Sequence, residues 1–205
     1  MMDILRFDEA KLIAALGQLS ARRRSLFAAL VATRLSGAFE IYARDAGAPL
    51  DGIRAASDHL WRQVESELSS NAVETEGQIE AVLALISDED SSAAYGAQAE
   101  DAAAALAYAL RSVMDPNPQE AAWTARRAYE CVDNLVISRE SVEIGGPAEE
   151  RIVQDPLIQS ELARQREDLE TATLSALDPA ILVRHREDCT RWGMNFFGEV
   201  MRNDL

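Results

Sequence analysis

The sequence predicts an all-α protein, a single-domain, multi-helix bundle of about seven to nine helices that extends over residues 1–205. Apolar residues recur at helical spacing in the long segments, and no segment shows the alternation of β-branched residues that is typical of strands. The chain has 205 residues, of which 48% are hydrophobic. This length and composition are sufficient for one substantial core.

Capping residues define the first three helices. Asp8 is expected to cap a short helix that ends near Leu19, and Ser20 to cap a second helix that ends near Gly47. Asp51 is expected to cap the third helix, whose apolar stripe should pack against the second. That stripe consists of Ile53, Ala56, Leu60, Val64 and Leu68.

The second helix carries a charge in the middle of its apolar face. A bend is expected at Ser36-Gly37, because Gly/Ser pairs are a common cause of helix kinks. At 100° per residue, Arg34 falls near the centre of an apolar sector. The sector consists of Phe27, Leu30, Val31, Ala38, Ile41 and Tyr42.

The second half of the chain predicts five more helices. A weak apolar stripe indicates a helix over 75–86. Residues 97–114 are apolar or small on nearly every side, so this helix is expected in the middle of the bundle, with Asp101 among its alanines. Pairs of an N-capping residue and proline start the last three helices. These pairs are Asn117-Pro118, Asp155-Pro156 and Asp178-Pro179.

Charge and cysteine content exclude several classes of protein. The formal net charge of −15 argues against a nucleic-acid partner, which would require a basic surface. Cys131 and Cys189 show no CxxC spacing and are too few for a disulfide framework, which suits a reducing cytoplasm. The N-terminus lacks the pattern of a signal peptide, and no apolar run approaches the roughly 18 to 20 residues that span a bilayer. We therefore expect a cytoplasmic protein without a membrane partner.

Arg34 requires a partner if it is buried. A guanidinium does not lose its charge, and an unpaired buried charge is prohibitively costly. Asp101, an acid on an otherwise apolar helix, is the candidate for a structural ion pair. Two alternatives stay open, namely extension of the Arg34 side chain to the surface and an anionic ligand bound by Arg34.

The sequence predicts no metal site and no cofactor. His185 and Cys189 share a helix face at a spacing that two zinc ligands could use, and Asp188 is nearby. Two further ligands are not indicated, however, and both residue types also occur in cores. His59, the other histidine, lies off the apolar stripe and is expected to be exposed.

No catalytic residue can be named. The chain contains no G-x-S-x-G motif, no phosphate-binding loop and no dinucleotide-binding fingerprint. Whether the protein is an enzyme is therefore left open, with a non-enzymatic role favoured.

An aromatic and two arginines suggest a surface for another protein. Trp123, Arg126 and Arg127 lie together on the polar face of their helix, and such clusters are enriched at interfaces. The alternative is that Trp123 only covers the loop before its helix.

Several segments resemble the YjaG-like family of bacterial proteins of unknown function, namely LFAALVATRL, AFEIYARDAG, DHLWRQV, AYGAQAEDAAAALAYAL and DPLIQSELARQREDL. The resemblance extends from about Phe7 to Phe197. It implies an all-helical fold, no established activity or cofactor, and a connection to signalling by histidine kinases. The matching positions are Arg34, Phe39, Trp61, Tyr95, Gly96, Asp101 and Pro156.

The leading hypothesis is a non-enzymatic, cytoplasmic protein that binds another protein, in a regulatory role. The alternative is a small-ligand-binding protein or enzyme with a pocket near Arg34 and Asp101. A metal-binding role of His185 and Cys189 comes third. The sequence sets neither the oligomeric state nor the identity of any partner.

Overall fold

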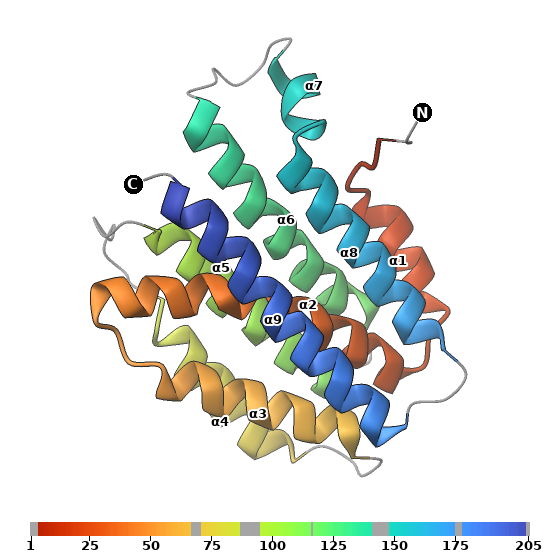
Figure 1. The fold of residues 1–205 in the computed structure, drawn as a ribbon. Coiled ribbons are helices and arrows are strands. Elements are labelled where there is room, and N and C mark those ends of the chain that lie inside the picture. The colour runs from red at the N-terminus through yellow and green to blue at the C-terminus, as the bar shows by residue number, and fades with distance from the viewer. Residues whose placement is uncertain are drawn as a thin grey trace.

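The computed structural model describes residues 4–66, 71–86, 95–115, 117–140, 148–174 and 178–203. Over these residues the chain forms nine helices and no strand, which confirms the predicted all-α bundle (Figure 1). The helices are α1 (Glu9–Gly17), α2 (Ala21–Ala46), α3 (Asp51–Glu65), α4 (Ala72–Leu83), α5 (Gly96–Met114), α6 (Pro118–Glu140), α7 (Ala148–Val153), α8 (Pro156–Thr173) and α9 (Pro179–Asn203).

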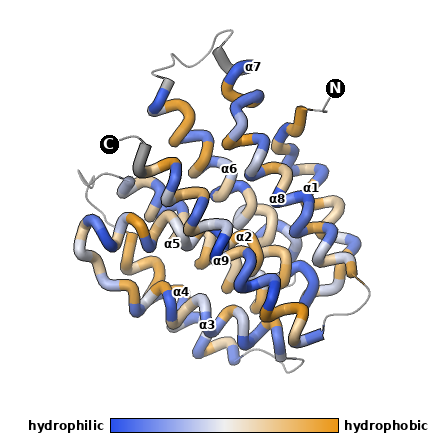
Figure 2. Tube along the Cα trace, viewed as in Figure 1, coloured by the Kyte–Doolittle hydropathy of each residue, from blue (hydrophilic) through white to orange (hydrophobic). Residues whose placement is uncertain are grey.

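Helix α2 is the centre of the bundle. It packs against α3, α5, α6, α8 and α9, and every side chain from Ser25 to Leu35 is buried. Hydrophobic and hydrophilic residues alternate along the outer helices, such as α3 and α9, because one side of each faces the core (Figure 2). Helix α5 packs against α2, α3, α4 and α6, in agreement with its predicted position inside the bundle.

Helix α2 is also long and apolar enough to cross a membrane, contrary to the expectation that no apolar run approaches this length. However, 83% of its apolar window is buried inside the bundle. Its composition is therefore explained by its central position in the core.

Several predicted helix ends agree with the structure, whereas the N-cap of α3 is Leu50 and not Asp51, which is the first residue of the helix. The Asp8 carboxylate accepts a hydrogen bond from the Lys11 amide (3.0 Å), and Asp155 caps α8 through the Leu157 amide (2.8 Å). Gly47 ends α2 with a φ of 68°, a left-handed conformation that glycine adopts without strain. The short helix α7 was not predicted, because its six residues are too few for a periodic pattern.

Helices α2 and α9 cross with their backbones in contact. A Cβ atom on Gly193 would lie 2.0 Å from the Arg34 carbonyl oxygen, and one on Gly37 would lie 2.6 Å from the Gly193 carbonyl carbon. Helix α2 continues through Gly37 as one helix, and the bend expected at Ser36-Gly37 stays a prediction. The structure thus gives Gly37 a packing role, since only two glycines facing each other permit this approach.

We expect Gly193→Ala to lower the free energy of unfolding by about 1 to 3 kcal/mol or more, because α9 must move away from α2. Urea unfolding followed by circular dichroism at 222 nm measures the change. The matched control is Gly77→Ala on α4, where a Cβ would meet nothing within 4 Å. This control should gain about 0.5 to 1 kcal/mol from helix propensity. Equal effects of the two substitutions would contradict the close crossing.

Candidate functional site

Arg34 lies at the centre of the candidate site and is paired inside the protein. Its side chain is 1% exposed, so it does not extend to the surface. The Nε and one terminal nitrogen donate to the two carboxylate oxygens of Glu161, at 3.2 and 2.9 Å. The other terminal nitrogen donates to Oδ2 of Asp168 at 2.5 Å. One guanidinium therefore binds two carboxylates, one of them in the two-pronged geometry that arginine favours.

Helix α8 supplies the polar partners from a single face. Glu161, Gln165 and Asp168 are spaced four and three residues apart, so their side chains point in the same direction. All three are buried. The Gln165 amide donates to Glu161 (2.9 Å) and to the backbone oxygen of Ala125 on α6 (3.0 Å). The network thereby connects α2, α6 and α8.

Helix α9 supplies an aromatic side chain next to the ion pairs. The guanidinium of Arg34 lies 5.4 Å from the centre of the Trp192 ring, and that of Arg164 lies 5.9 Å from it. Trp192 also stacks on Phe196, with 4.5 Å between the ring centres. Since Trp192 precedes Gly193, the close crossing of α2 and α9 brings this ring to Arg34.

Burial makes the charges of this network costly. Desolvation opposes the charge of Arg34, but Asp168 and Glu161 outweigh this effect and hold its pKa well above the ordinary value. For Asp168, burial raises the pKa even though Arg34 favours the charged form. The second carboxylate of the network is therefore not fully compensated by the guanidinium that it shares.

A cavity of about 400 Å³ lies beside the network, between α8 and α9. Both helices pack against α2, whereas their backbones make little contact with each other (Figure 1). Asp168 forms part of the cavity wall, so the buried charges border an open volume. The other lining residues are Arg164, Glu167, Thr171, His185, Asp188, Cys189, Arg191, Trp192 and Asn195.

The structure brings His185, Asp188 and Cys189 to this cavity but gives them no metal geometry. Within the described residues, no group of three or more histidine, cysteine or acidic side chains could hold a metal ion. Burial, together with the charge of Asp168, raises the pKa of the Cys189 thiol to about 11. The thiol therefore stays protonated near neutral pH and is a poor nucleophile.

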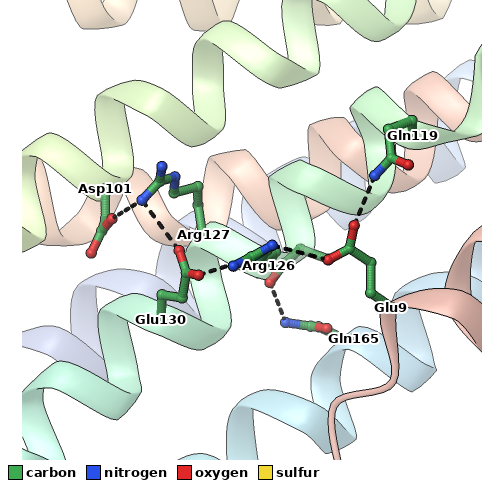
Figure 3. A network of polar contacts seen from close by, with 8 residues as sticks. Glu9, Asp101, Gln119, Arg126, Arg127, Glu130 and Gln165 are labelled. Atoms are coloured by element: carbon green, nitrogen blue, oxygen red, sulfur yellow. Dashed lines mark hydrogen bonds and ion pairs between the residues drawn. The ribbon is translucent and has the colours of Figure 1, made fainter.

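The predicted partner of Arg34 is wrong. Asp101 is buried, but it accepts a hydrogen bond from Arg127 of α6 at 3.3 Å (Figure 3). The side chain of Arg34 points from α2 toward α8, whereas the side chain of Asp101 points from α5 toward α6. The burial and ion pairing expected for Arg34 are present, with Glu161 and Asp168 in the place of Asp101.

Asp101 is held in an unfavourable environment. Burial raises its pKa to about 6, because the single contact with Arg127 does not offset the loss of water and Glu130 is nearby. The charged form of this carboxylate therefore costs stability at neutral pH.

The candidate interaction surface is occupied by internal contacts. Arg126 binds Glu130 (2.7 Å) and Glu9 (3.3 Å), and Arg127 binds Glu130 (3.2 Å) as well as Asp101 (Figure 3). Trp123 is half-buried and packs on the Tyr108 ring, with 5.4 Å between centres. These contacts give the cluster a role in holding α1, α5 and α6 together, and its use as an interface stays a prediction.

His59 was expected to be exposed but is fully buried. Its Nδ1 lies 3.0 Å from Glu74 and its Nε2 lies 2.9 Å from the Thr75 hydroxyl. Helix α4 covers this edge of α3, and both partners come from α4. The sequence did not show that α4 packs against the side of α3 that carries His59.

The sequence did not identify Glu161 and Asp168. Their spacing with Gln165 places them beside the apolar stripe of α8, which is the available signal. In a chain with 35 acidic residues, many carboxylates have such a spacing by chance. Only the contact with Arg34 distinguishes these two.

Comparisons with known proteins give a family and a fold. The family model described as "Protein of unknown function (DUF416)" matches residues 11–198. The crystal structure of a DUF416 family protein from Shewanella baltica OS155 has a TM-score of 0.76 and 15% sequence identity, and the match covers 87% of this chain and 93% of that chain. At this identity the likeness concerns the fold alone. No curated protein matches the chain. The unknown function implied by the resemblance agrees with the family match, and the YjaG-like grouping stays a prediction.

We expect Arg34→Met to lower the free energy of unfolding by about 3 to 5 kcal/mol, because it leaves two buried carboxylates without a cation. Arg34→Lys should lower the free energy of unfolding by less, since lysine keeps the positive charge but lacks the planar guanidinium that binds a carboxylate through two hydrogen bonds. Arg62→Met, at an arginine whose side chain is 61% exposed, is the control and should change stability by under about 0.5 kcal/mol. Chemical unfolding at pH 7 measures all three. A loss for Arg34→Met no larger than that of the control would contradict the buried network.

We expect Asp101→Asn to raise the free energy of unfolding at pH 7 by about 1 to 3 kcal/mol. Because the folded-state pKa of about 6 exceeds the ordinary value of 3.8, the gain should grow as pH rises from about 4 to about 6 and then level off. Urea midpoints measured across this pH range give the profile. Asp45→Asn, at an exposed aspartate, should show no such rise, and the same profile in both variants would refute the role of burial.

Proposed function

The chain belongs to the DUF416 family of proteins of unknown function, and we propose that it binds a small polar ligand in the cavity between α8 and α9. The observation that carries this proposal is a buried, charged network that borders an open volume. Cavities with a few convergent polar groups and perturbed carboxyl pKa values are the usual place of a ligand site. The cavity, about 400 Å³, has the size of such sites.

The cost of the network supports a functional role. Replacement of a buried ion pair by apolar residues of similar volume is often neutral or stabilising, so the core does not need such charges for stability. A binding site, in contrast, needs fixed polar groups with a defined orientation. Asp168 and Trp192 have this property, because Arg34 and Phe196 hold them in place.

The sequence analysis gave a pocket near Arg34 and Asp101 as the alternative to a protein-binding role. We propose this alternative in a changed form, with Asp168 in place of Asp101, and prefer it to the protein-binding hypothesis. Arg126 and Arg127, on which that hypothesis relied, have acidic partners within the chain. Among the described residues, the exposed large hydrophobic side chains are spread over several elements, with two of the five on α4, in the pattern of ordinary surfaces. They are Ile4, Val73, Leu83, Leu174 and Val183. A protein partner and a cytoplasmic location remain predictions.

Binding is a better description of the site than nucleophilic catalysis. The Cys189 thiol, which lines the cavity, has a pKa of about 11 and stays protonated. A cysteine nucleophile requires a lowered pKa.

The proposal is tested by equilibrium dialysis of the protein against a small-molecule extract of cells of the source organism, followed by mass spectrometry of what the protein retains. We expect at least one compound to be retained at roughly one per chain by the wild type. Asn195→Trp, which places a large ring at the cavity wall, should reduce this retention at least tenfold because it fills the volume.

The control is Asn134→Trp, an equal change at an exposed position of α6 that does not line the cavity. It should retain the compound as the wild type does. Retention of no compound, or equal loss in both variants, would contradict a ligand site between α8 and α9.

A further inference from the structure

The buried network at the cavity contains one positive charge fewer than negative charges. Arg34 contributes one positive charge, and Glu161 and Asp168 contribute two negative charges. These residues are 1%, 3% and 3% exposed, so solvent screens the imbalance poorly. A buried charge that lacks a counter-charge is costly, and a cation placed next to the network would remove this cost.

The arginines that line the cavity reduce this imbalance but do not remove it, because each also has an acidic partner of its own. Arg164 donates to Glu167 at 2.8 Å, and its charge also acts on Asp168. Its buried Nε has no hydrogen-bond partner among the described residues. Arg191 is paired with Asp188 at 3.1 Å and is 67% exposed. Apart from His185, the lining residues thus carry two positive charges against three negative ones. A cation therefore fits the cavity better than an anion does.

Asp168 offers the contact point for such a cation. Among the described residues, the hydrogen bond to this carboxylate comes from Arg34 and goes to Oδ2. Oδ1 accepts none from these residues, and Asp168, although only 3% exposed, borders the cavity. A ligand can therefore reach a carboxylate oxygen that α2 and α8 already hold in position.

Trp192 supplies a flat apolar surface beside this carboxylate. Its ring lines the cavity, with Phe196 stacked on it and the guanidinium groups of Arg34 and Arg164 within 6 Å of its centre. Because two cations already lie near the ring, the charge of a ligand belongs at Asp168 and its flat part at the ring. A ligand that combines a flat or apolar part with a cation would contact both the ring and Asp168.

On the basis of the ligand-binding function above, we propose that the ligand carries a protonated amine or amidine group that pairs with Oδ1 of Asp168 beside the Trp192 ring. An organic cation suits the site better than a metal ion. The cavity is much larger than an ion, and the described residues contain no metal-binding group of three or more ligands.

Three probes of one shape test this charge preference, namely benzamidine, benzamide and benzoate, which are cationic, neutral and anionic at pH 7. Binding is followed by the indole N–H signal of Trp192 in two-dimensional ¹H–¹⁵N spectra, which Trp192→Phe assigns among the three tryptophans. We expect benzamidine to shift this signal saturably. Benzamide should bind at least tenfold more weakly and benzoate more weakly still.

Asp168→Asn should weaken benzamidine binding at least tenfold. This variant leaves Arg34 paired one-to-one with Glu161, so its fold should be retained. Glu170→Gln removes a charge from an exposed position of the same helix and should bind as the wild type does. If Asp168→Asn does not fold, the order of the three probes on the wild type decides the matter alone.

The proposal is overturned if benzoate binds as tightly as benzamidine, if folded Asp168→Asn binds benzamidine unchanged, or if benzamidine causes no saturable shift. These outcomes are separate from the dialysis result. A retained compound together with no preference for benzamidine would leave the binding function in place and remove the cationic class. Retention of no compound would remove the binding function itself.

Discussion

The permanent charge of Arg34 at the centre of the bundle constrains the rest of the structure. A guanidinium keeps its proton, and every side chain of α2 from Ser25 to Leu35 is buried, so the charge must be balanced inside the protein. Glu161 and Asp168 do this from α8, and Gln165 connects the same face of α8 to the α6 backbone. The rotation and register of α8 against α2 and α6 therefore follow from the position of one arginine.

The close crossing of α2 and α9 at the same position explains why a cavity lies beside these charges. Gly37 and Gly193 bring α9 onto the backbone of α2, while α8 is held to α2 through the longer side chains of Arg34 and its partners. Because α9 lies closer to the backbone of α2 than α8 does, α8 and α9 cannot pack against each other along their full length. The space that remains is lined by Asp168 of α8 and Trp192 of α9.

Local signals in the sequence were sufficient to predict the helices. They were not sufficient to predict which residues of different helices contact each other. Capping residues such as Asp8 and Asp155 determine helix starts through bonds within a few residues, so these starts could be predicted. Burial of Arg34 followed from helical periodicity in the same way. Its partners could not be predicted, because the position of α8 against α2 is a tertiary property and acidic residues are abundant. The same reason applies to the role of Gly37, which depends on a glycine 156 positions later in the chain.

Asp168 is the part of the network that structural stability explains least. Glu161 alone would neutralise Arg34 and bind it through two hydrogen bonds, which is sufficient to hold α8 against α2. The second carboxylate adds the cost of another buried negative charge, and its pKa is raised as a result. Natural proteins deviate from the most stable arrangement mainly where function requires it. The deviation here lies at the residue that borders the cavity, and this is the physical reason for proposing a ligand site at Asp168.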